Sequence, residues 1–498
     1  MAKKQAAVLL DGKSLSISEL VSVARDNSSV GISVDSAELV NASRKTLESR
    51  LRQGNTIYGV NTGFGELQNS RIAPGEAGRL QENLVRSTSA GVGAPLSRDE
   101  TRAMMLLRLN TLVKGYSGVR MDVVTLLCEM LNRHVHPVIP SRGSVGASGD
   151  LAPLAHMALV LMGEGNAELE GVIMNGSDAL SKAGLKPVSL REKEGLALIN
   201  GTQFMTALGA LAVHDIGLLL QQSLIVFSMS LESLGGRISP FDERVAALRA
   251  HRGSMEVAAS IRRICSGSSR LDRGNSPQDP YTLRCAPQVI GPLEDMLRYC
   301  ENIIVTEMNS TTDNPIVLPD DGEVISAGNF HGQPVAVALD ALAIPLQALA
   351  SFSERRTARL TDHKLSGLSP FLSRRPGLES GYMVAQYTAA ALVSEGKVLS
   401  HPSSSDSIPT SANQEDYVSM GAYSALKLRQ MVENSFRVIA IEAVCAAQAL
   451  DLTGGPSAPG VAKAHSTIRE TVPTLDKDRE ISGEIEDCCM LLKRGALL

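Results

Sequence analysis

Residues 142–157 read Arg-Gly-Ser-Val-Gly-Ala-Ser-Gly-Asp-Leu-Ala-Pro-Leu-Ala-His-Met, with three glycines at every third position. Gly143, Gly146 and Gly149 lie among small residues, and glycine tolerates backbone angles and close approaches that other residues do not. The pattern therefore predicts a backbone folded tightly on itself. The Lys-Ser/Thr pair of a phosphate-binding P-loop is missing, and Ser148 lacks the Gly-x-Ser-x-Gly frame of a nucleophile elbow.

A compressed loop at Ala147-Ser148-Gly149 allows chemistry in which the backbone itself becomes the reagent. The nitrogen of Gly149 can then reach the carbonyl carbon of Ala147. Ring closure with loss of two waters, one of them from the Ser148 hydroxyl, leaves an exocyclic alkene conjugated to an imidazolone. Such a ring is an electrophile, which no natural side chain supplies.

The stretch at residues 143–157 resembles the signature of the histidine and aromatic amino-acid ammonia-lyases. This family builds the electrophile 4-methylideneimidazol-5-one (MIO) autocatalytically from an Ala-Ser-Gly triad, here Ala147-Ser148-Gly149. A Gly- and Ser-rich loop without this resemblance would more often be only a structural turn. Six separated motifs follow the family's order between Tyr58 and Arg479, so the resemblance extends over nearly the whole chain.

The resemblance implies a mainly α-helical fold of the ammonia-lyase/fumarase-like superfamily, organised around a bundle of long helices. We expect a smaller N-terminal domain, residues 1–203, to carry the MIO loop. Residues 204–498 are expected to form the helical bundle and a C-terminal helical domain. Family sites combine residues from several subunits, so the resemblance implies a homotetramer with shared active sites and an inactive monomer.

Two residues before the bundle acquire roles from the resemblance. Tyr58 lies in the glycine-rich loop Ile57–Gly65, and on composition alone it is more often a packing tyrosine. In the family this tyrosine is the candidate base for the β-proton. Asn200 precedes the long apolar run and would ordinarily cap a helix. The match of Asn200-Gly-Thr-Gln to the family implies instead that its amide points at the cofactor or the substrate.

Later motifs supply further substrate-binding residues. Arg284 lies between apolar neighbours, four residues after one proline and three before another, and this placement suits a fixed guanidinium that grips a carboxylate. The resemblance assigns Arg284 the substrate carboxylate, with Gln278 as a substrate-binding residue and Tyr281 as a catalytic one. It also implies that Phe330 lies beside the substrate ring. Glu415, a helix-starting residue by default, is placed in the pocket by its Asn-Gln-Glu-Asp motif.

Two departures from the family pattern affect the substrate. Thr88 stands where histidine lyases and many tyrosine lyases have a histidine that contacts the substrate ring, and it offers one hydroxyl on a shorter side chain. Tyr417 replaces the common histidine after Asp416. Glu415 favours histidine as the substrate because a carboxylate pairs with an imidazole N–H, whereas Thr88 argues against a standard histidine enzyme.

The predicted reaction is therefore non-oxidative deamination of an aromatic L-amino acid to an α,β-unsaturated acid and ammonia, with histidine to urocanate slightly favoured. A tyrosine or phenylalanine ammonia-lyase and a 2,3-aminomutase using the same site are alternatives. Outside this class stand an inactive scaffold that keeps the fold and a serine hydrolase using Ser148. The hydrolase lacks any placed His and Asp partners.

Composition argues against several other classes of function. The chain has 498 residues, a net charge of −5 and 43% apolar residues, so no basic field exists to attract nucleic acid. Seven cysteines follow no disulfide framework, which favours reduced thiols in the cytoplasm, and the nine histidines suggest no metal site. The apolar run Phe204–Leu231 contains His214 and Asp215, which would be costly in lipid, so it predicts a buried helix and no membrane.

Two further patterns predict local structure. The sequence Ser16-Ile-Ser-Glu19 precedes an apolar-periodic run and is typical of a capping box at a helix start. Residues 236–275 are polar and rich in Arg, Ser and Gly, which predicts an exposed excursion from the helical body.

Overall fold

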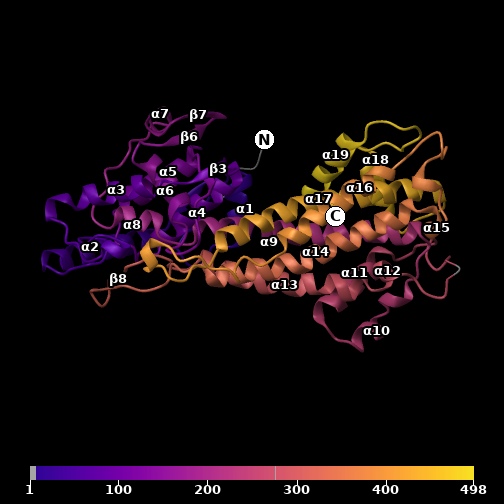
Figure 1. Cartoon of the computed structure of the whole chain (residues 1–498), viewed down its shortest axis with the longest axis horizontal. Coiled ribbons are helices and arrows are strands. Elements are labelled where there is room, and N and C mark those ends of the chain that lie inside the picture. The colour runs from indigo at the N-terminus through magenta and orange to yellow at the C-terminus, as the bar shows by residue number, and fades with distance from the viewer. Residues whose placement is uncertain (1–6, 275) are drawn as a thin grey trace. The chain divides into compact units, whose positions relative to one another are not determined.

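Helices make up most of the chain in the computed structural model, which describes residues 7–274 and 276–498 (Figure 1). The predicted mainly α-helical, long-helix class is confirmed. Four helices within the described residues are 23 to 33 residues long. These are α9 (Gln203–Ser233), α13 (Ala286–Met308), α14 (Gln333–Thr361) and α17 (Gly421–Thr453).

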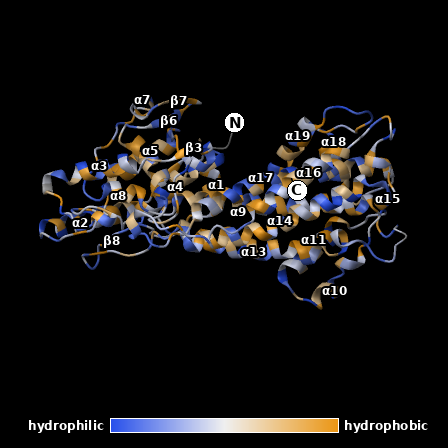
Figure 2. Cartoon of the chain, in the orientation of Figure 1, coloured by the Kyte–Doolittle hydropathy of each residue, from blue (hydrophilic) through white to orange (hydrophobic). Residues whose placement is uncertain are grey.

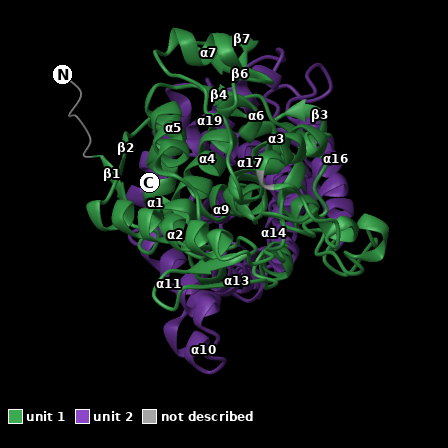
Figure 3. Cartoon of the chain, turned by 90° about the vertical axis from the view of Figure 1, so that its left-hand side faces the viewer, with its two compact units in different colours: residues 1–214, 301–339, 402–426 green, residues 215–300, 340–401, 427–498 purple. Residues whose placement is uncertain are grey.

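Backbone contacts divide the described chain into two compact units (Figure 3). Unit 1 draws on residues 1–214, 301–339 and 402–426, and unit 2 on residues 215–300, 340–401 and 427–498. Each of the four long helices contributes to both units. The expected domains 1–203 and 204–498 are continuous in sequence, whereas these units interleave, and the domain boundary stays a prediction.

Unit 1 combines short helices with small sheets. Its strands pair as β1–β2 (parallel) and as β3–β5, β4–β6–β7 and β8–β9 (antiparallel). The elements wholly in this unit are β1 (Val8–Leu10), α1 (Ile17–Arg25), β2 (Val30–Ile32), α2 (Val34–Arg52), η1 (Gly65–Leu67), η2 (Pro74–Glu76), α3 (Ala77–Thr88), β3 (Val92–Pro95), α4 (Arg98–Val113), α5 (Met121–Asn132), β4 (His136–Pro137), β5 (Pro140–Arg142), α6 (Leu151–Leu161), β6 (Asn166–Leu169), β7 (Val172–Asn175), α7 (Gly176–Lys182), α8 (Glu194–Ile199), β8 (Ile316–Leu318), β9 (Glu323–Ile325) and η5 (Ser411–Asn413).

Local sequence accounts for the way these helices start and pack. The capping box predicted at α1 is confirmed: the Ser16 hydroxyl accepts a hydrogen bond from the Glu19 N–H (3.3 Å), and the Glu19 carboxylate accepts one from the Ser16 N–H (2.9 Å). Helix α4 is buried on every side from Thr101 to Val113. A helix that is buried on every side lies at the centre of a hydrophobic core. Helix α4 lies behind the site described below.

Unit 2 is helical in the described residues. The elements wholly in this unit are η3 (Ser239–Phe241), α10 (Glu243–Ala247), α11 (Arg252–Ile264), α12 (Tyr281–Arg284), α15 (His363–Ser366), η4 (Pro370–Leu372), α16 (Met383–Leu399), α18 (Pro459–Arg469) and α19 (Ser482–Lys493). The prediction of an exposed excursion at residues 236–275 is wrong for α11, because Val257, Ala258 and Ile261 are buried. These apolar positions, spaced one helical turn apart, give an otherwise polar segment one packed face.

Two helices, α9 and α14, are long and apolar enough to cross a membrane by length and composition alone. In Figure 2, hydrophobic residues recur along both. About 72% of the apolar window of α9 and 67% of that of α14 is already buried inside the protein. This burial is what the core helix of a folded bundle requires, and it agrees with the expected buried helix at Phe204–Leu231.

Candidate active site

The glycine-rich loop between β5 and α6 adopts a compressed backbone. Ala147 and Gly149 form an antiparallel bridge across the single residue Ser148, and Gly149 also pairs with Gly201. The φ angle of Gly149 is +73°, and a Cβ atom there would lie 2.1 Å from the Gly201 carbonyl oxygen. Only glycine fits this position, because both the backbone angle and the close approach exclude a side chain.

Asn200 holds the centre of this loop. It is the C-cap residue of α8, and its side-chain Nδ2 donates a hydrogen bond to the Ser148 carbonyl oxygen at 2.9 Å. Its Oδ1 atom is buried and has no hydrogen-bond partner among the described residues. The expected contact between the Asn200 amide and the triad is therefore present in the structure, and the default role as an N-terminal helix cap does not apply.

Asp150 fixes the exit of the loop. Its carboxylate accepts hydrogen bonds from the Ser144 hydroxyl (2.7 Å) and the Met205 N–H (3.0 Å), and its own N–H donates to the Gly201 carbonyl (2.6 Å). Burial raises the pKa of Asp150 from 3.8 to about 7, and the hydrogen bonds oppose that shift. This carboxyl joins the start of α9 to the reactive loop.

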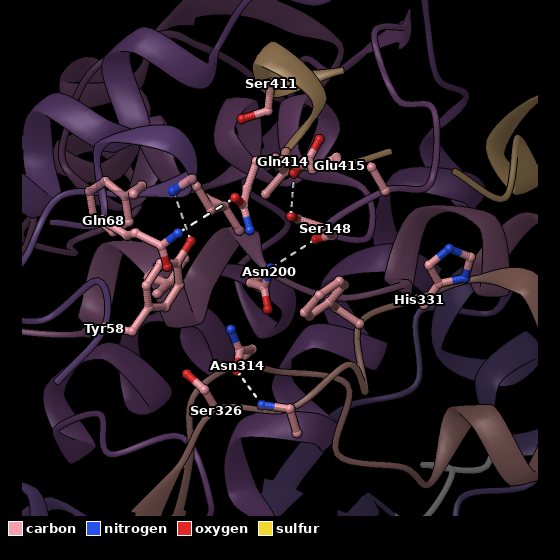
Figure 4. A pocket seen from close by; sticks show the side chains of 18 of the residues that line it. Tyr58, Gln68, Ser148, Asn200, Asn314, Ser326, His331, Ser411, Gln414 and Glu415 are labelled. Carbon is pink, nitrogen blue, oxygen red and sulfur yellow. Dashed lines mark hydrogen bonds between the residues drawn. The ribbon is translucent and has the colours of Figure 1, made fainter. Parts of the chain in front are cut away.

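Glu415 approaches the triad from the other side. The Ser148 hydroxyl donates to one oxygen of the Glu415 carboxylate at 2.6 Å, and the Thr410 hydroxyl donates to the other at 2.7 Å. The default role of Glu415 as a helix start is wrong, because α17 begins only at Gly421. Figure 4 shows Ser148 between Glu415 and Asn200, which come from segments far apart in the sequence.

Tyr58 forms another wall of the same pocket (Figure 4). Its phenolic oxygen accepts a hydrogen bond from the Gly65 N–H at 3.0 Å, within the loop that contains both residues. Gln81, fully buried on α3, anchors this loop: it donates to the Gly59 carbonyl (2.9 Å) and accepts from the Leu196 N–H (3.0 Å). The Tyr58 loop and α8, which positions Asn200, are therefore held by one side chain.

Aromatic and imidazole rings line the third wall. Phe330 and His331 both face the pocket. The His331 ring stacks on Tyr417 with centroids 6.1 Å apart and planes at 15°, and His331 Nε2 lies 3.2 Å from the Tyr417 carbonyl oxygen. Tyr417 thus has a definite place at this wall, where the sequence showed only a departure from the family.

The pocket encloses about 460 Å³, a volume suited to one amino-acid-sized ligand. All of its lining residues belong to unit 1. They are Tyr58, Phe64, Gly65, Gln68, Leu84, Ala147, Ser148, Leu151, Leu196, Ile199, Asn200, Asn314, Ser326, Ala327, Phe330, His331, Ser411, Gln414, Glu415, Asp416 and Tyr417.

Five of the predicted site residues do not line this pocket. Gly149 belongs to the triad, of which only Ala147 and Ser148 are lining residues. Thr88 is the last residue of α3, one helical turn beyond the lining residue Leu84. Gln278, Tyr281 and Arg284 belong to unit 2. There the Arg284 guanidinium stacks over the Tyr281 ring at 4.7 Å, and its Nε donates to the Asp279 carbonyl.

Several lining residues escaped the sequence analysis. Gln68 and Ser326 lie on loops without a distinctive motif, Ser411 is the first residue of η5, and all three line the pocket. Gln414 was quoted only as part of the Asn-Gln-Glu-Asp motif, although its neighbour Glu415 was singled out. Pairing of the Thr410 and Glu415 backbones turns this segment toward the triad, and sequence spacing alone contains no such signal.

Within residues 7–274 and 276–498, no three His, Cys, Asp or Glu side chains gather in a way that could hold a metal ion. All seven cysteines are free thiols. The polar groups around Ser148 are amides, hydroxyls and one carboxylate, a set suited to binding an organic group by hydrogen bonds.

Comparison with known proteins gives consistent matches over the whole chain. The family model described as aromatic amino acid lyase matches residues 15–470. Histidine ammonia-lyase from Gloeobacter violaceus is 51% identical over 496 residues, covering 99% of this chain and 96% of that protein. The structure of histidine ammonia-lyase from Trypanosoma cruzi is 40% identical with a TM-score of 0.93, covering 99% of this chain and 94% of that one. Tyrosine aminomutase from Streptomyces globisporus is 37% identical with a TM-score of 0.95, covering 99% and 98%.

Proposed function

The chain belongs to the aromatic amino acid lyase family, and we propose that it converts histidine to urocanate and ammonia. It is a carbon–nitrogen lyase. The observation that carries the choice of histidine is the Glu415 carboxylate, 2.6 Å from the Ser148 hydroxyl inside the pocket. A carboxylate in this place pairs with an imidazole N–H, and a phenyl ring offers it no such donor.

The residues present fit an MIO group formed from Ala147-Ser148-Gly149. The triad backbone is already compressed, Gly149 has no side chain to obstruct ring closure, and the Asn200 Oδ1 atom is buried with no partner in the part of the chain that the structure describes. Asn200 Nδ2 would hold the ring oxygen, which is the carbonyl oxygen of Ser148. When formed, MIO supplies the electrophile that a substrate amine requires.

The chain's own side chains supply placement and proton transfer in this proposal. Tyr58 takes the β-proton, and the hydrogen bond from the Gly65 N–H stabilises charge on its oxygen. Phe330 borders the substrate ring, and Glu415 orients it. The walls of the pocket hold these groups in a fixed geometry, which lowers the entropic part of the barrier.

We include in the proposal a homotetramer in which Gln278, Tyr281 and Arg284 complete the site of another subunit. Those three residues do not line the pocket of their own chain, although the reaction needs a cation for the substrate carboxylate. An arginine fork binds a carboxylate through two parallel hydrogen bonds, so Arg284 suits that task. In this arrangement, Thr88 lies near the substrate ring. The proposal also places the enzyme in the cytoplasm, where its thiols stay reduced.

An arylalanine lyase or a 2,3-aminomutase is the second candidate. It is favoured by Thr88 and Tyr417, which replace two histidines of the usual pattern, and by the likeness to a tyrosine aminomutase. Tyr417 stacked on His331 makes that wall more aromatic than a histidine would. An inactive scaffold of the same fold is disfavoured by the intact triad together with Tyr58 and Arg284.

Product analysis separates these functions. The purified enzyme is incubated with histidine, tyrosine and phenylalanine in turn, and ultraviolet absorbance and mass spectrometry identify the products. We expect urocanate and ammonia from histidine at the highest kcat/KM. A β-amino acid as the main product would identify an aminomutase, and turnover confined to tyrosine or phenylalanine would identify an arylalanine lyase. Absence of any product with all three would favour the scaffold.

A further inference from the structure

A fully buried arginine lies directly behind the reactive loop. Arg108 is on α4, within the stretch that is buried on every side. Its Nη1 atom donates to the Asn200 carbonyl oxygen at 2.7 Å and to the Gln203 side-chain oxygen at 3.0 Å. Asn200 therefore has two attachments: its side chain holds the Ser148 carbonyl oxygen, and its own carbonyl oxygen is held by Arg108.

The neighbouring residue Gly201 continues this arrangement. A Cβ atom on Gly201 would lie 2.7 Å from Arg108 Nη1, so the backbone rests against the guanidinium with no room for a side chain. On its opposite side, Gly201 pairs with Gly149 and accepts the hydrogen bond of the Asp150 N–H. The segment Asn200–Gly201 thus forms a short layer between Arg108 and the Ala147–Gly149 triad.

The charge of Arg108 is not needed to balance a carboxylate. The nearby Asp313 is paired with Lys193 at 2.7 Å, and both side chains are fully buried. Arg108 makes no ion pair within hydrogen-bond range among the described residues, and its Nε and Nη2 atoms are buried without partners. Burying a cation and two unpaired donors is unfavourable, so stability alone does not account for this residue.

We propose that Arg108 is a positioning residue for the reactive loop, holding the Asn200–Gly201 layer from behind so that the Asn200 amide stays on the Ser148 carbonyl oxygen. The inference rests on the proposed function, because it gives Arg108 a part in forming and holding the group made from the triad. Two hydrogen bonds from Nη1 of a buried guanidinium restrict both the Asn200 carbonyl and the Gln203 side chain. The positive charge of Arg108 also stabilises negative charge on the Ser148 carbonyl oxygen, which the Asn200 amide contacts.

The test uses a matched control on the same helix. Arg102 is also fully buried on α4 and donates to backbone carbonyls, at Val23 and Leu131, but none of its hydrogen bonds reaches the Asn200–Gly201 layer. Arg108→Met and Arg102→Met are compared with the unsubstituted full chain. The measurements are intact mass, thermal unfolding and steady-state kinetics with histidine. Intact mass reports the loss of two waters from the triad independently of turnover.

We expect Arg108→Met to remain folded, because Lys193 still neutralises Asp313. In this variant, either the fraction of chains whose triad has lost two waters or the kcat of those dehydrated chains should fall at least about tenfold. The KM for histidine should change less than about threefold. Arg102→Met should keep both quantities within about twofold of the unsubstituted chain. Equal losses in the two variants, or no loss in Arg108→Met, would overturn the inference.

A second pair of variants covers the case in which Arg108→Met does not fold. Arg108→Lys retains a charged donor, and Arg108→Gln retains a neutral donor of similar length. A higher dehydrated fraction, or a higher kcat of the dehydrated chains, in the lysine variant than in the glutamine variant supports a positioning cation. Equal values of both quantities in the two variants contradict it. If the unsubstituted chain itself shows no loss of two waters, the proposed function fails, and that result is distinct from every outcome for Arg108.

Discussion

Ser148 makes two contacts that serve different ends. Its carbonyl oxygen accepts from the Asn200 amide, and its hydroxyl donates to Glu415. If the proposed ring forms, the first contact would hold the oxygen that stays on the ring, and the second would engage the hydroxyl that leaves as water.

The choice of histidine can be tested at Glu415. Glu415→Gln keeps the shape and one acceptor oxygen, replaces the other carboxylate oxygen with an NH2 donor, and removes the charge. A charge-assisted hydrogen bond contributes about 1.5–3 kcal/mol, so kcat/KM for histidine should fall roughly 10- to 100-fold. Any activity with phenylalanine should change much less. An undiminished kcat/KM for histidine in steady-state assays would show that Glu415 does not recognise the imidazole.

Asp150 gives the folded state a pH dependence. Burial raises its pKa from 3.8 to about 7, so the folded chain binds this proton more tightly than the unfolded chain. Its contribution to stability is fully present below about pH 4 and is lost as pH rises to about 7, at roughly 1.4 kcal/mol per pH unit. Relative to Asp150→Asn, the unsubstituted protein should lose stability between about pH 5 and 7. Above about pH 7, the difference in stability between the two proteins should stay constant. Thermal unfolding of both proteins across this range measures the difference, and a constant difference would contradict the raised pKa.

At the scale of elements, the site depends on loops held by buried side chains. Gln81 on α3 joins the Tyr58 loop to α8, the helix that ends at Asn200. Two segments of the proposed site that are distant in sequence therefore share one anchor. The amide satisfies one backbone acceptor and one backbone donor, so no apolar residue can replace it without leaving both unpaired.

Replacement of this anchor should affect stability and catalysis together. Gln81→Leu leaves the Gly59 carbonyl and the Leu196 N–H without partners, which should lower the free energy of unfolding by about 2–4 kcal/mol. Turnover should also fall, because Tyr58 and Asn200 lose their common support. Gln53→Leu, at an exposed position, is the control and should change neither quantity. Chemical denaturation and steady-state assays on both variants give the comparison, and equal effects would refute the anchoring role.

Local sequence patterns predict individual helices and loops well, but they predict the contacts between distant segments poorly. The Ser16–Glu19 capping box and the helix at Phe204–Leu231 were both predictable, because their signals are short-range. The compressed backbone at Ala147–Gly149 followed from glycine spacing and small residues. The contacts of Gln81 and Arg108 were not predictable, since each joins segments at least 22 residues apart through hydrogen bonds that leave no periodic pattern.

At the scale of the whole molecule, the candidate site predicted from sequence divides into two groups. One pocket of unit 1 is lined by Tyr58, Ala147, Ser148, Asn200, Phe330 and Glu415. Gln278, Tyr281 and Arg284 lie in unit 2 and do not line it. A motif reports that a residue belongs to a site without saying which copy of the chain supplies it. The proposed homotetramer resolves this division.

Shared sites predict complementation between two inactive chains. Ser148→Ala lacks the hydroxyl needed for the triad, and Arg284→Ala lacks the carboxylate-binding cation, so each should be inactive alone. Coexpressed in equal amounts, they should form mixed tetramers in which about a quarter of the sites receive an intact triad from one chain and an intact Arg284 from another. Activity per site measured on the purified mixture tests this. No recovery above the two separate proteins would mean that one chain supplies both residues.

The proposed function depends on a covalent change in three small residues of a folded protein. Intact-mass measurement of freshly purified chain, with peptide mapping across residues 142–157, observes that change directly. We predict a mass two waters below that of the encoded sequence, with the loss confined to Ala147-Ser148-Gly149 and absent from Ser148→Ala. A folded chain at its full encoded mass, with an ordinary peptide through Ser148, would contradict the account.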